Sequence, residues 1–447
     1  MEIRQSRFGD HLVLHPAGRI DTQTSEAFQT ELLAAVADSG TNLIIDFAEV
    51  EYISSAGFRA LMTAARQMPN QRRIAVAALN DLVRELFAIA RFHHVIPVFG
   101  SPAEAAAAWT NPPQPQQGGQ PALQDAAPIR VHFWGTRGSL PTPVGQAAIR
   151  AKIRDALLMA RKHDLSSTDA IDAFIDRELP FSIRGTFGGN TSCVEILTNG
   201  DEYVLCDLGT GVREFGNQAL ARHEPGFKAT YNVFLSHVHW DHIMGFPLFA
   251  PAYILGNTIR IHGCHSVLQQ AMRVQHSAPW FPVDFAALGA DIQFVELEPG
   301  VETQVAGFSV TPIKQPHSGD SYGYRFSRGG KSVVYATDGE HKAEAVSPAY
   351  PFVEFYRDAD LLIFDAMYSL ADSISVREDW GHSSNMVAVE LAQMARVKRL
   401  VLFHHEPMFD DAMIDRVLAE TIRFEEISRS GHKVEVISAF DGLELTI

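Results

Sequence analysis

The chain has 447 residues, of which 37 are Lys or Arg and 53 are Asp or Glu, so its formal net charge is −16. A chain this acidic is a poor match for a long nucleic acid, because that partner usually calls for a basic surface. No apolar stretch approaches the ~20 residues that cross a membrane, and 3 cysteines are too few for a disulfide framework. The first residues lack the apolar core of a signal peptide, so we expect a cytoplasmic protein of two or three domains.

Residues 1–110 alternate short apolar runs with stretches of helical character, which predicts a sheet covered by helices. Asp21 or Thr22 is expected to cap the first helix, and Ser54 or Ser55 the second. We predict strands over 12–14, 42–47, 74–77 and 95–98, and helices reaching about 38 and 68 and covering 81–90 and 102–109.

Residues 43–61 (LIIDFAEVEYISSAGFRAL) resemble the core of the STAS family, the anti-sigma-factor antagonists, and the resemblance covers roughly residues 1–108. It implies an α/β STAS regulatory domain, a protein partner of the anti-sigma factor or serine kinase type, and phosphorylation of Ser55. A phosphate is favoured at a helix N-terminus by the helix dipole, and its charge would block docking of a partner. The alternative is that Ser54 and Ser55 serve only as helix caps.

Residues 111–128 are rich in Pro, Gln and Gly, so they cannot bury enough apolar surface to fold alone. We predict a linker there, and a second domain over 129–447 that begins with an alternating strand at 129–134. Within it, residues 144–183 carry Ile149, Ile153 and Leu157 at helical spacing. This predicts an inserted helical pair near the rim of a pocket, where a lid is one role to test.

A cluster of potential metal ligands, His237-Val238-His239-Trp240-Asp241-His242, follows an apolar run that is predicted to be a buried strand. At the end of a strand, residues two apart point the same way, so His237 and His239 can hold one metal ion together. Asp241 and His242 follow the turn and can reach a second ion. Imidazole and carboxylate suit zinc, and also manganese or iron. The alternative, a chance cluster on a solvated loop, is weakened by four candidate ligands within six residues.

Later strand ends supply further candidates, namely His317, Asp338 and either His404 or His405. A carboxylate at Asp338 can bridge two cations and neutralise part of their charge. Asp207 ends another buried strand, where it either braces the metal-binding loop as a hydrogen-bond acceptor or caps a turn.

The hexad, with a His, an Asp and a His following in that order, resembles the metallo-β-lactamase superfamily. The resemblance implies an αββα sandwich that uses two divalent ions, zinc first and manganese or iron as alternatives, to supply a metal-bound hydroxide. Motif alignment favours His404 over His405. The implied ligands are His237, His239 and His317 for one ion, Asp241, His242 and His404 for the other, and Asp338 between them.

Residues 135–139 (GTRGS), 189–192 (GNTS), 321–325 (SYGYR) and 381–384 (GHSS) resemble motifs of the ribonuclease Z-like phosphodiesterases. That branch implies a catalytic role for His382, which binds the phosphate or protonates the leaving oxygen, and Asp365 is the acidic residue that would steer it. An imidazole that titrates near neutrality suits this task. Asp241 is counted among the catalytic residues as well as among the implied metal ligands.

The tRNA-processing members of that branch carry a Gly-rich, basic arm between the hexad and the next His. In this chain, residues 243–316 contain only Arg260, Arg273 and Lys314 as basic residues. This departure favours a small phosphodiester, such as a cyclic nucleotide, on whose base Trp280 or Phe281 would stack unless both belong to the core. The alternatives are a hydrolase of RNA, a lactone or a thioester, and a STAS signalling scaffold with a vestigial hydrolase. The oligomeric state stays open, with a homodimer among the possibilities.

Overall fold

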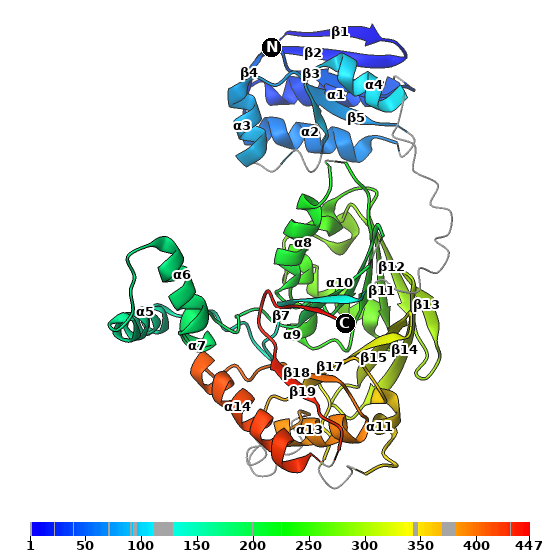
Figure 1. Ribbon diagram of the computed structural model, residues 1–447. Helices are drawn as coiled ribbons and strands as arrows, with labels where there is room; N and C mark the ends of the chain where they lie inside the picture. The colour runs from blue at the N-terminus through cyan, green and yellow to red at the C-terminus, as the bar shows by residue number, and fades with distance from the viewer. Residues whose placement is uncertain are drawn as a thin grey trace. The chain divides into compact units, whose positions relative to one another are not determined.

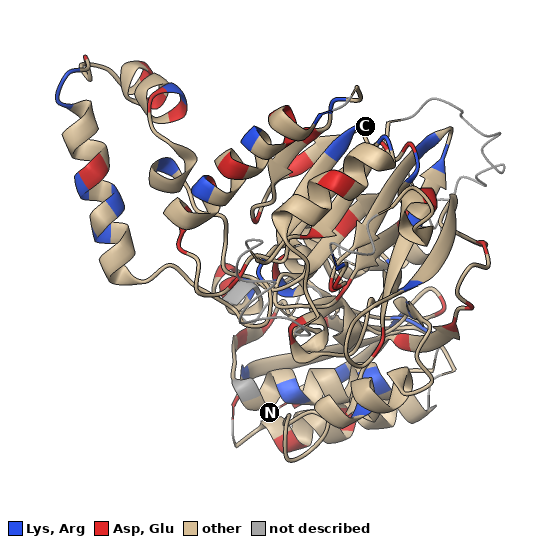
Figure 2. Ribbon diagram, turned by 90° about the horizontal axis from the view of Figure 1, so that it is seen from below, with Lys and Arg blue, Asp and Glu red and all other residues tan. Residues whose placement is uncertain are grey.

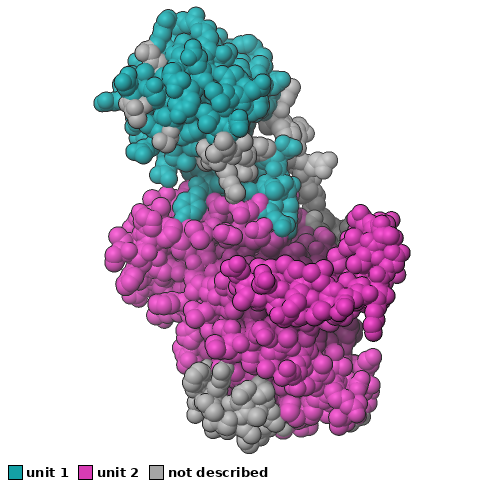
Figure 3. All heavy atoms as spheres, turned by 90° about the vertical axis from the view of Figure 1, so that its left-hand side faces the viewer, with its two compact units in different colours: residues 1–122, 218–228, 253–257 teal, residues 123–217, 229–252, 258–447 magenta. Residues whose placement is uncertain are grey.

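The computed structural model describes residues 2–21, 23–38, 40–69, 72–89, 92, 96–110, 128–198, 200–224, 226–342, 347–368, 381–429 and 431–447. The chain divides into two compact units (Figure 3). One contains residues 1–122 with 218–228 and 253–257, and the other contains residues 123–217, 229–252 and 258–447. The predicted linker at 111–128 lies outside the described residues except for its last residue, so it remains our proposed domain boundary.

The first unit is built on a six-stranded sheet of order β1-β2-β3-β5-β6, with β4 paired to β2. Side chains alternate between the faces of a strand, and β3 shows this clearly. Leu43 and Ile45 belong to the larger core, under α1, α2 and α3, whereas Ile44 belongs to a smaller core with Ala105 and Ala106 of α4. The elements are β1 (Glu2–Phe8), β2 (His11–Ile20), α1 (Ser25–Asp38), β3 (Leu43–Asp46), β4 (Val50–Ile53), α2 (Ser55–Gln67), β5 (Ile74–Ala77), α3 (Asp81–Ile89), β6 (Val98–Phe99) and α4 (Pro102–Thr110).

The predicted helices and sheet of this unit are confirmed, but two of its strands were not predicted and the position of a third was wrong. β1 was not predicted, because it is an exposed edge strand whose residues carry no apolar alternation. β4 was not predicted either, and the last strand lies at Val98–Phe99 instead of 95–98. Short strands of this kind are defined by their pairing partners more than by their own residues.

The second unit is a sandwich of two seven-stranded sheets with helices on the outer faces, as the αββα prediction required (Figure 1). One core fills the space between the sheets. In it, the ring centroids of Phe133 from the first sheet and Phe403 from the second lie 6.1 Å apart. Strands such as β17 (LLIFD) are buried along their whole length, because both of their faces are covered. The first sheet has the order β12-β11-β10-β9-β8-β7-β20, and the second has the order β13-β14-β15-β16-β17-β18-β19.

The second sheet buries its outer face under α11, α13 and α14, which contribute Phe352, Val387 and Val417 to one apolar cluster. On the first sheet, the rings of Tyr203 and Tyr231 stack with their centroids 5.0 Å apart. Phe215, from helix α8 (Val212–Ala221), packs against both rings. The remaining strands are β7 (Arg130–Gly135), β8 (Cys193–Leu197), β9 (Glu202–Cys206), β10 (Thr230–Phe234), β11 (Thr258–Gly263), β12 (Asp291–Glu296), β13 (Thr303–Val305), β14 (Phe308–Gln315), β15 (Ser321–Arg328), β16 (Lys331–Ala336), β17 (Leu361–Asp365), β18 (Arg399–Phe403), β19 (Glu435–Ser438) and β20 (Glu444–Thr446).

A helical arm, α5 to α7, leaves the sandwich between β7 and β8 (Figure 1). The predicted insertion therefore contains three helices instead of a pair, since the short α7 follows α6. Lys152 ties the arm to the sandwich, because its Nζ pairs with Asp411 of the sandwich at 2.5 Å. The same Nζ donates to the carbonyl of Gly185, at the end of α7, at 2.7 Å. Among the described residues after 128, the α-helices are α5 (Gln146–Ala160), α6 (Thr168–Arg177), α7 (Phe181–Arg184), α8 (Val212–Ala221), α9 (Trp240–Ile243), α10 (Leu268–Gln275), α11 (Pro351–Tyr356), α13 (Asn385–Met394) and α14 (Asp411–Ser428).

Candidate metal centre

The candidate ligands gather where strands of both sheets end. β16, β17 and β18 are parallel neighbours, so the residues that follow them meet at one edge of the second sheet. Asp207 and His404 come directly after a strand, and Asp338 comes two residues after one. Their φ values are 61° for Asp207, 61° for His404 and 53° for Asp338. Residues other than glycine rarely adopt this left-handed conformation, which costs of order 1–3 kcal/mol and occurs most often at functional sites. The surrounding fold therefore holds these three side chains in place against local strain.

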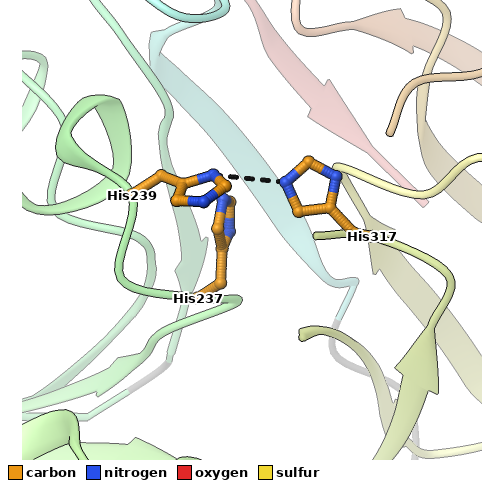
Figure 4. Close-up of side chains that lie close together, drawn as sticks. All are labelled: His237, His239 and His317. Carbon is orange, nitrogen blue, oxygen red and sulfur yellow. Dashed lines mark hydrogen bonds between the residues drawn. The ribbon is translucent and has the colours of Figure 1, made fainter. Parts of the chain in front are cut away.

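His237, His239 and His317 form the first cluster, and their candidate ligand atoms lie within 4.8 Å of one another (Figure 4). His317 Nδ1 donates to the Gly381 carbonyl at 2.8 Å, so its Nε2 keeps a lone pair and lies 3.2 Å from His239 Nδ1. His237 Nδ1 lies 3.0 Å from Ser236 Oγ, and its own Nε2 is buried. Burial, helped by the neighbouring His242, lowers the pKa of His237 well below its ordinary value and keeps that lone pair available.

Asp241, His242, Asp338 and His404 form the second cluster, and all four are buried with ligand atoms within 4.8 Å of one another. His242 Nδ1 donates to Asp207 at 2.7 Å, which turns its Nε2 toward the cluster. That Nε2 lies 3.2 Å from Asp241 Oδ2, and His404 Nε2 lies 3.1 Å from the same oxygen. One carboxylate oxygen thus faces two imidazole lone pairs at the distance expected around a shared cation.

The carboxylate of Asp338 lies between the two clusters. Its Oδ1 is 3.3 Å from His242 Nε2 and 3.4 Å from His404 Nε2. Its Oδ2 is 3.7 Å from His237 Nε2 and 3.9 Å from His317 Nε2. Each oxygen therefore faces a different cluster, which is the arrangement of a bridging ligand.

Asp207 holds the metal-binding segment in place by accepting hydrogen bonds from Ser236 and His242. Of the two roles that the sequence left open for Asp207, hydrogen-bond acceptor or turn cap, the structure shows the first. Its Oδ2 accepts hydrogen bonds from Ser236 Oγ, His242 Nδ1 and the Tyr335 hydroxyl, each at 2.7 Å, and its Oδ1 accepts from the Ser236 N–H. A carboxylate that fixes the tautomer of a metal-binding imidazole typically raises the affinity of the site for its metal.

His382 lies beside both clusters and donates through Nδ1 to Asp365 Oδ2 at 2.7 Å. Its ring stacks on that of His404, with the two centroids 5.0 Å apart, and its centroid lies 5.5 Å from that of the His317 ring. Burial lowers the pKa of His382, but the charge and hydrogen bond of Asp365 outweigh burial and raise the pKa to about 9. The structure thus brings His382 and Asp365 together as the sequence predicted.

His405 points away from both clusters, although it follows His404 directly. Its Nε2 donates to the Ala439 carbonyl at 2.8 Å, and burial lowers its pKa to about 3. The structure therefore places His404, and not His405, at the second cluster.

Ser139 and Glu340, which were not predicted as site residues, support the site through hydrogen bonds that backbone N–H groups donate. The Ser139 N–H donates to Asp241 Oδ2 at 2.7 Å, and Glu340 Oε2 accepts from the Gly381 N–H at 2.9 Å. Gly381 has φ 89°, and a Cβ there would fall onto the imidazole of His317. The glycine-containing motifs were visible in the sequence, but a backbone N–H leaves no signal in residue type.

The donor set fits two divalent cations. In the described part of the chain, the buried Nε2 atoms of His237 and His242 have no hydrogen-bond partner. A buried polar atom without a partner is costly, and a cation that takes both lone pairs removes that cost. Mixed imidazole and carboxylate donors of this kind suit zinc, manganese or iron.

Four other residues singled out in the sequence lie outside these clusters. Trp280 is 72% exposed, so it is not a core residue, whereas Phe281 packs on His276 with ring centroids 4.8 Å apart. Ser54 caps α2, since its Oγ accepts from the Gly57 N–H at 3.4 Å. Ser55 begins α2, and its side chain lies outside what the structure describes.

Comparison with known proteins identifies both parts of the chain. Residues 3–105 match the model of the STAS domain, and residues 202–405 match that of the beta-lactamase superfamily domain. BtrV of Bordetella bronchiseptica, provisionally named an anti-sigma factor antagonist, is 30% identical over 110 residues that cover 95% of it and 24% of this chain. This chain belongs to the STAS family at its N-terminus and to the metallo-β-lactamase superfamily beyond it.

The metallo-β-lactamase-fold domain is a hydrolase domain related to ribonuclease Z. Ribonuclease Z of Thermoplasma acidophilum is 22% identical over 334 residues, which cover 65% of this chain and 90% of that protein. The structure of unliganded yeast PDE1 aligns with a TM-score of 0.48 at 14% identity, over 72% of this chain and all (100%) of that one. Across the described residues, no helix combines the length and hydropathy needed to span a membrane.

Proposed function

We propose that the metallo-β-lactamase-fold domain hydrolyses a small phosphodiester, with a cyclic nucleotide as the first candidate. The observation that carries this proposal is the position of His382, an imidazole beside both ligand clusters that is oriented by Asp365. In the proposed assignment, zinc is the first candidate, with manganese or iron as alternatives. His237, His239 and His317 hold one ion, Asp241, His242 and His404 hold the other, and Asp338 lies between them.

Two divalent cations at these ligands would supply an activated water and charge stabilisation for a phosphate. The residues of the chain provide the rest. Because Nδ1 of His382 donates to Asp365, the proton on Nε2 is free to pass to the leaving oxygen. Asp365 holds this tautomer in place, and Asp207 and Gly381 do the same for His242 and His317.

A small substrate is supported by the charge of the segment between the hexad and His317. Residues 243–316 offer three basic side chains, of which Lys314 pairs with Asp320 at 2.7 Å. A long RNA would need many more phosphate contacts than this segment offers. RNA remains the second candidate substrate, because the relatives of this domain include proteins named ribonuclease Z.

We further propose that the STAS domain regulates the hydrolase by binding a protein of the anti-sigma factor or serine kinase type. Its similarity to BtrV supports this partner class. Ser55 is the candidate phosphorylation site, since it begins α2 and a phosphate there would meet the positive end of the helix dipole. A cytoplasmic location is part of the same proposal. Mass spectrometry of the protein from native cells tests the site, and a lasting absence of phosphate at Ser55 would contradict it.

The experiment that tests the enzyme is turnover on bis-p-nitrophenyl phosphate, on 3′,5′-cyclic nucleotides and on a precursor tRNA, with protein loaded with zinc or manganese. We expect cleavage of the small phosphodiesters and its loss in Asp241→Asn. The matched control is Asp291→Asn, an exposed aspartate on β12 that should keep full activity. If the metal-loaded protein cleaves a lactone or thioester and no phosphodiester, the proposal is wrong. Normal capture of protein partners without any turnover would indicate a signalling scaffold.

A further inference from the structure

The helical arm carries an apolar stripe that this chain leaves exposed. Ile149, Ile153 and Leu157 follow one another at four-residue spacing along α5, so they share one face of the helix. They are 48%, 57% and 64% exposed. All residues of α5 are described and none is buried, although an isolated helix of about 15 residues is marginal in water. This face therefore needs a partner to stabilise it.

The second helix of the arm has a stripe of the same design. Ile171 and Ile175 are 39% and 37% exposed, whereas Phe174 turns inward and packs on His163 with ring centroids 4.8 Å apart. Because the stripes on α5 and α6 are both accessible, the two helices of one chain do not bury them against each other.

Charged residues flank both stripes, and their signs are opposite. On α5, Arg150 and Arg154 directly follow Ile149 and Ile153, and on α6, Asp172 and Asp176 directly follow Ile171 and Ile175. In Figure 2 the ribbon of the arm is coloured blue at basic residues and red at acidic residues. Within one chain, Arg154 pairs with Asp155 and Asp176 pairs with Arg184. Both ion pairs are exposed and contribute little stability, so replacing them with ion pairs to a partner costs little.

We propose that a second copy of this chain docks on the arm, with α5 of one copy against α6 of the other. A two-fold axis makes this contact twice, because the same patch is used on both subunits. Each contact then joins two apolar stripes and places the arginines beside the aspartates of the partner, as charged flanking positions do in coiled coils. Lys152 supports this docking by holding α5 to the sandwich.

Another occupant fits these charges less well. An RNA would favour the basic face of α5, but the aspartates of α6 on the same arm would repel it. The proposal concerns assembly only and does not depend on the substrate of the metal centre.

The test is the mass of the full-length protein by light scattering across a range of concentrations. We expect a dimer, twice the 49.3 kDa of one chain. Arg150→Asp with Arg154→Asp should weaken dimerisation roughly tenfold or more, because like charges would then face each other. Asp172→Arg with Asp176→Arg should have the same effect. The combination of all four changes should restore the dimer, since the charge pairs are restored with reversed sign.

The matched control reverses Arg416 and Arg423, two exposed arginines on α14, to aspartate and should leave the dimer unchanged. Far-UV circular dichroism confirms that the variants stay folded, which is expected because the changed side chains are not buried. A wild-type monomer at every concentration overturns the proposal. So does a dimer that survives both charge reversals, or an arginine variant that loses binding to a single-stranded RNA without any change in mass.

Discussion

The imidazole of His382 is held between Asp365 and the stacked ring of His404, so its orientation is set from two sides. An imidazole placed in this way can pass a proton only through Nε2. The carboxylate of Asp365 also accepts from the Met367 N–H, which fixes it in turn. Small changes at either residue should therefore be visible in turnover.

We predict that His382→Ala lowers kcat by roughly 10²–10⁴-fold, the usual contribution of a general acid, with little change in bound metal. Asp365→Asn should lower kcat less, because the neutral amide still orients the ring. Steady-state kinetics and metal analysis on the same preparations check this. Undiminished turnover in His382→Ala would remove it from the mechanism.

His341 is a buried histidine outside the ligand clusters, and it should make the domain sensitive to acid. Its Nδ1 lies 2.9 Å from the Tyr350 hydroxyl and its Nε2 lies 3.4 Å from that of Tyr356. Burial lowers its pKa to about 3. The unfolded chain therefore binds the proton first as the pH falls below about 6.5, the ordinary histidine value, and the free energy of unfolding decreases.

Because of this lowered pKa, we predict that His341 decreases the free energy of unfolding by about 1.4 kcal/mol for each pH unit below about 6. His341→Phe should remove this contribution and flatten the pH dependence of stability. Urea unfolding at a series of pH values measures the difference in slope. Equal slopes in both proteins would show that His341 is not buried in its neutral form.

At the scale of elements, three loops of the site are tied together at Gly381. Its N–H donates to Glu340 and its carbonyl accepts from His317, so the loop of Asp338 and the loop of His382 share one anchor. Glu340 N–H donates in turn to the Pro316 carbonyl at 2.7 Å. This connection explains why residues far apart in sequence keep a common geometry.

Removal of the anchor in Glu340→Ala should lower kcat, by about tenfold for a positioning residue that touches no substrate. The KM should change less than kcat, and the melting temperature should fall only slightly. Glu354→Ala serves as the control, since Glu354 is an exposed residue of α11 that pairs only with nearby Arg357 among the described residues. If both variants behave alike, the loop does not depend on Glu340.

For the molecule as a whole, the metal centre should contribute to stability as well as chemistry. Cations that bind only the folded state raise its stability, by about 2.7 kcal/mol at a hundredfold excess over Kd. Chelation should therefore lower the unfolding transition of the metallo-β-lactamase-fold domain and leave that of the STAS domain unchanged. Differential scanning calorimetry with and without a chelator measures this. Asp241→Asn should already melt early and respond weakly, and equal shifts in wild type and variant would contradict the assignment.

The sequence by itself determined both fold families and most of the candidate ligands. The hexad lies within six consecutive residues, and the STAS segment is continuous, so local pattern was enough to find them. The ends of buried apolar runs also located His317 and Asp338, because such runs are recognisable as strands.

Only the tertiary structure decided which neighbours of those residues face the site. His404 and His405 are adjacent in sequence, but a backbone φ of 61° at His404 turns one side chain to the cluster while the other bonds to Ala439. Ser139 acts through its backbone N–H, and the carboxylate of Glu340 acts by accepting from the backbone N–H of Gly381. β1 is a strand because β2 lies beside it. Long-range contacts of this kind leave no periodic or compositional signal, so they become visible only when distant segments of the chain lie together in space.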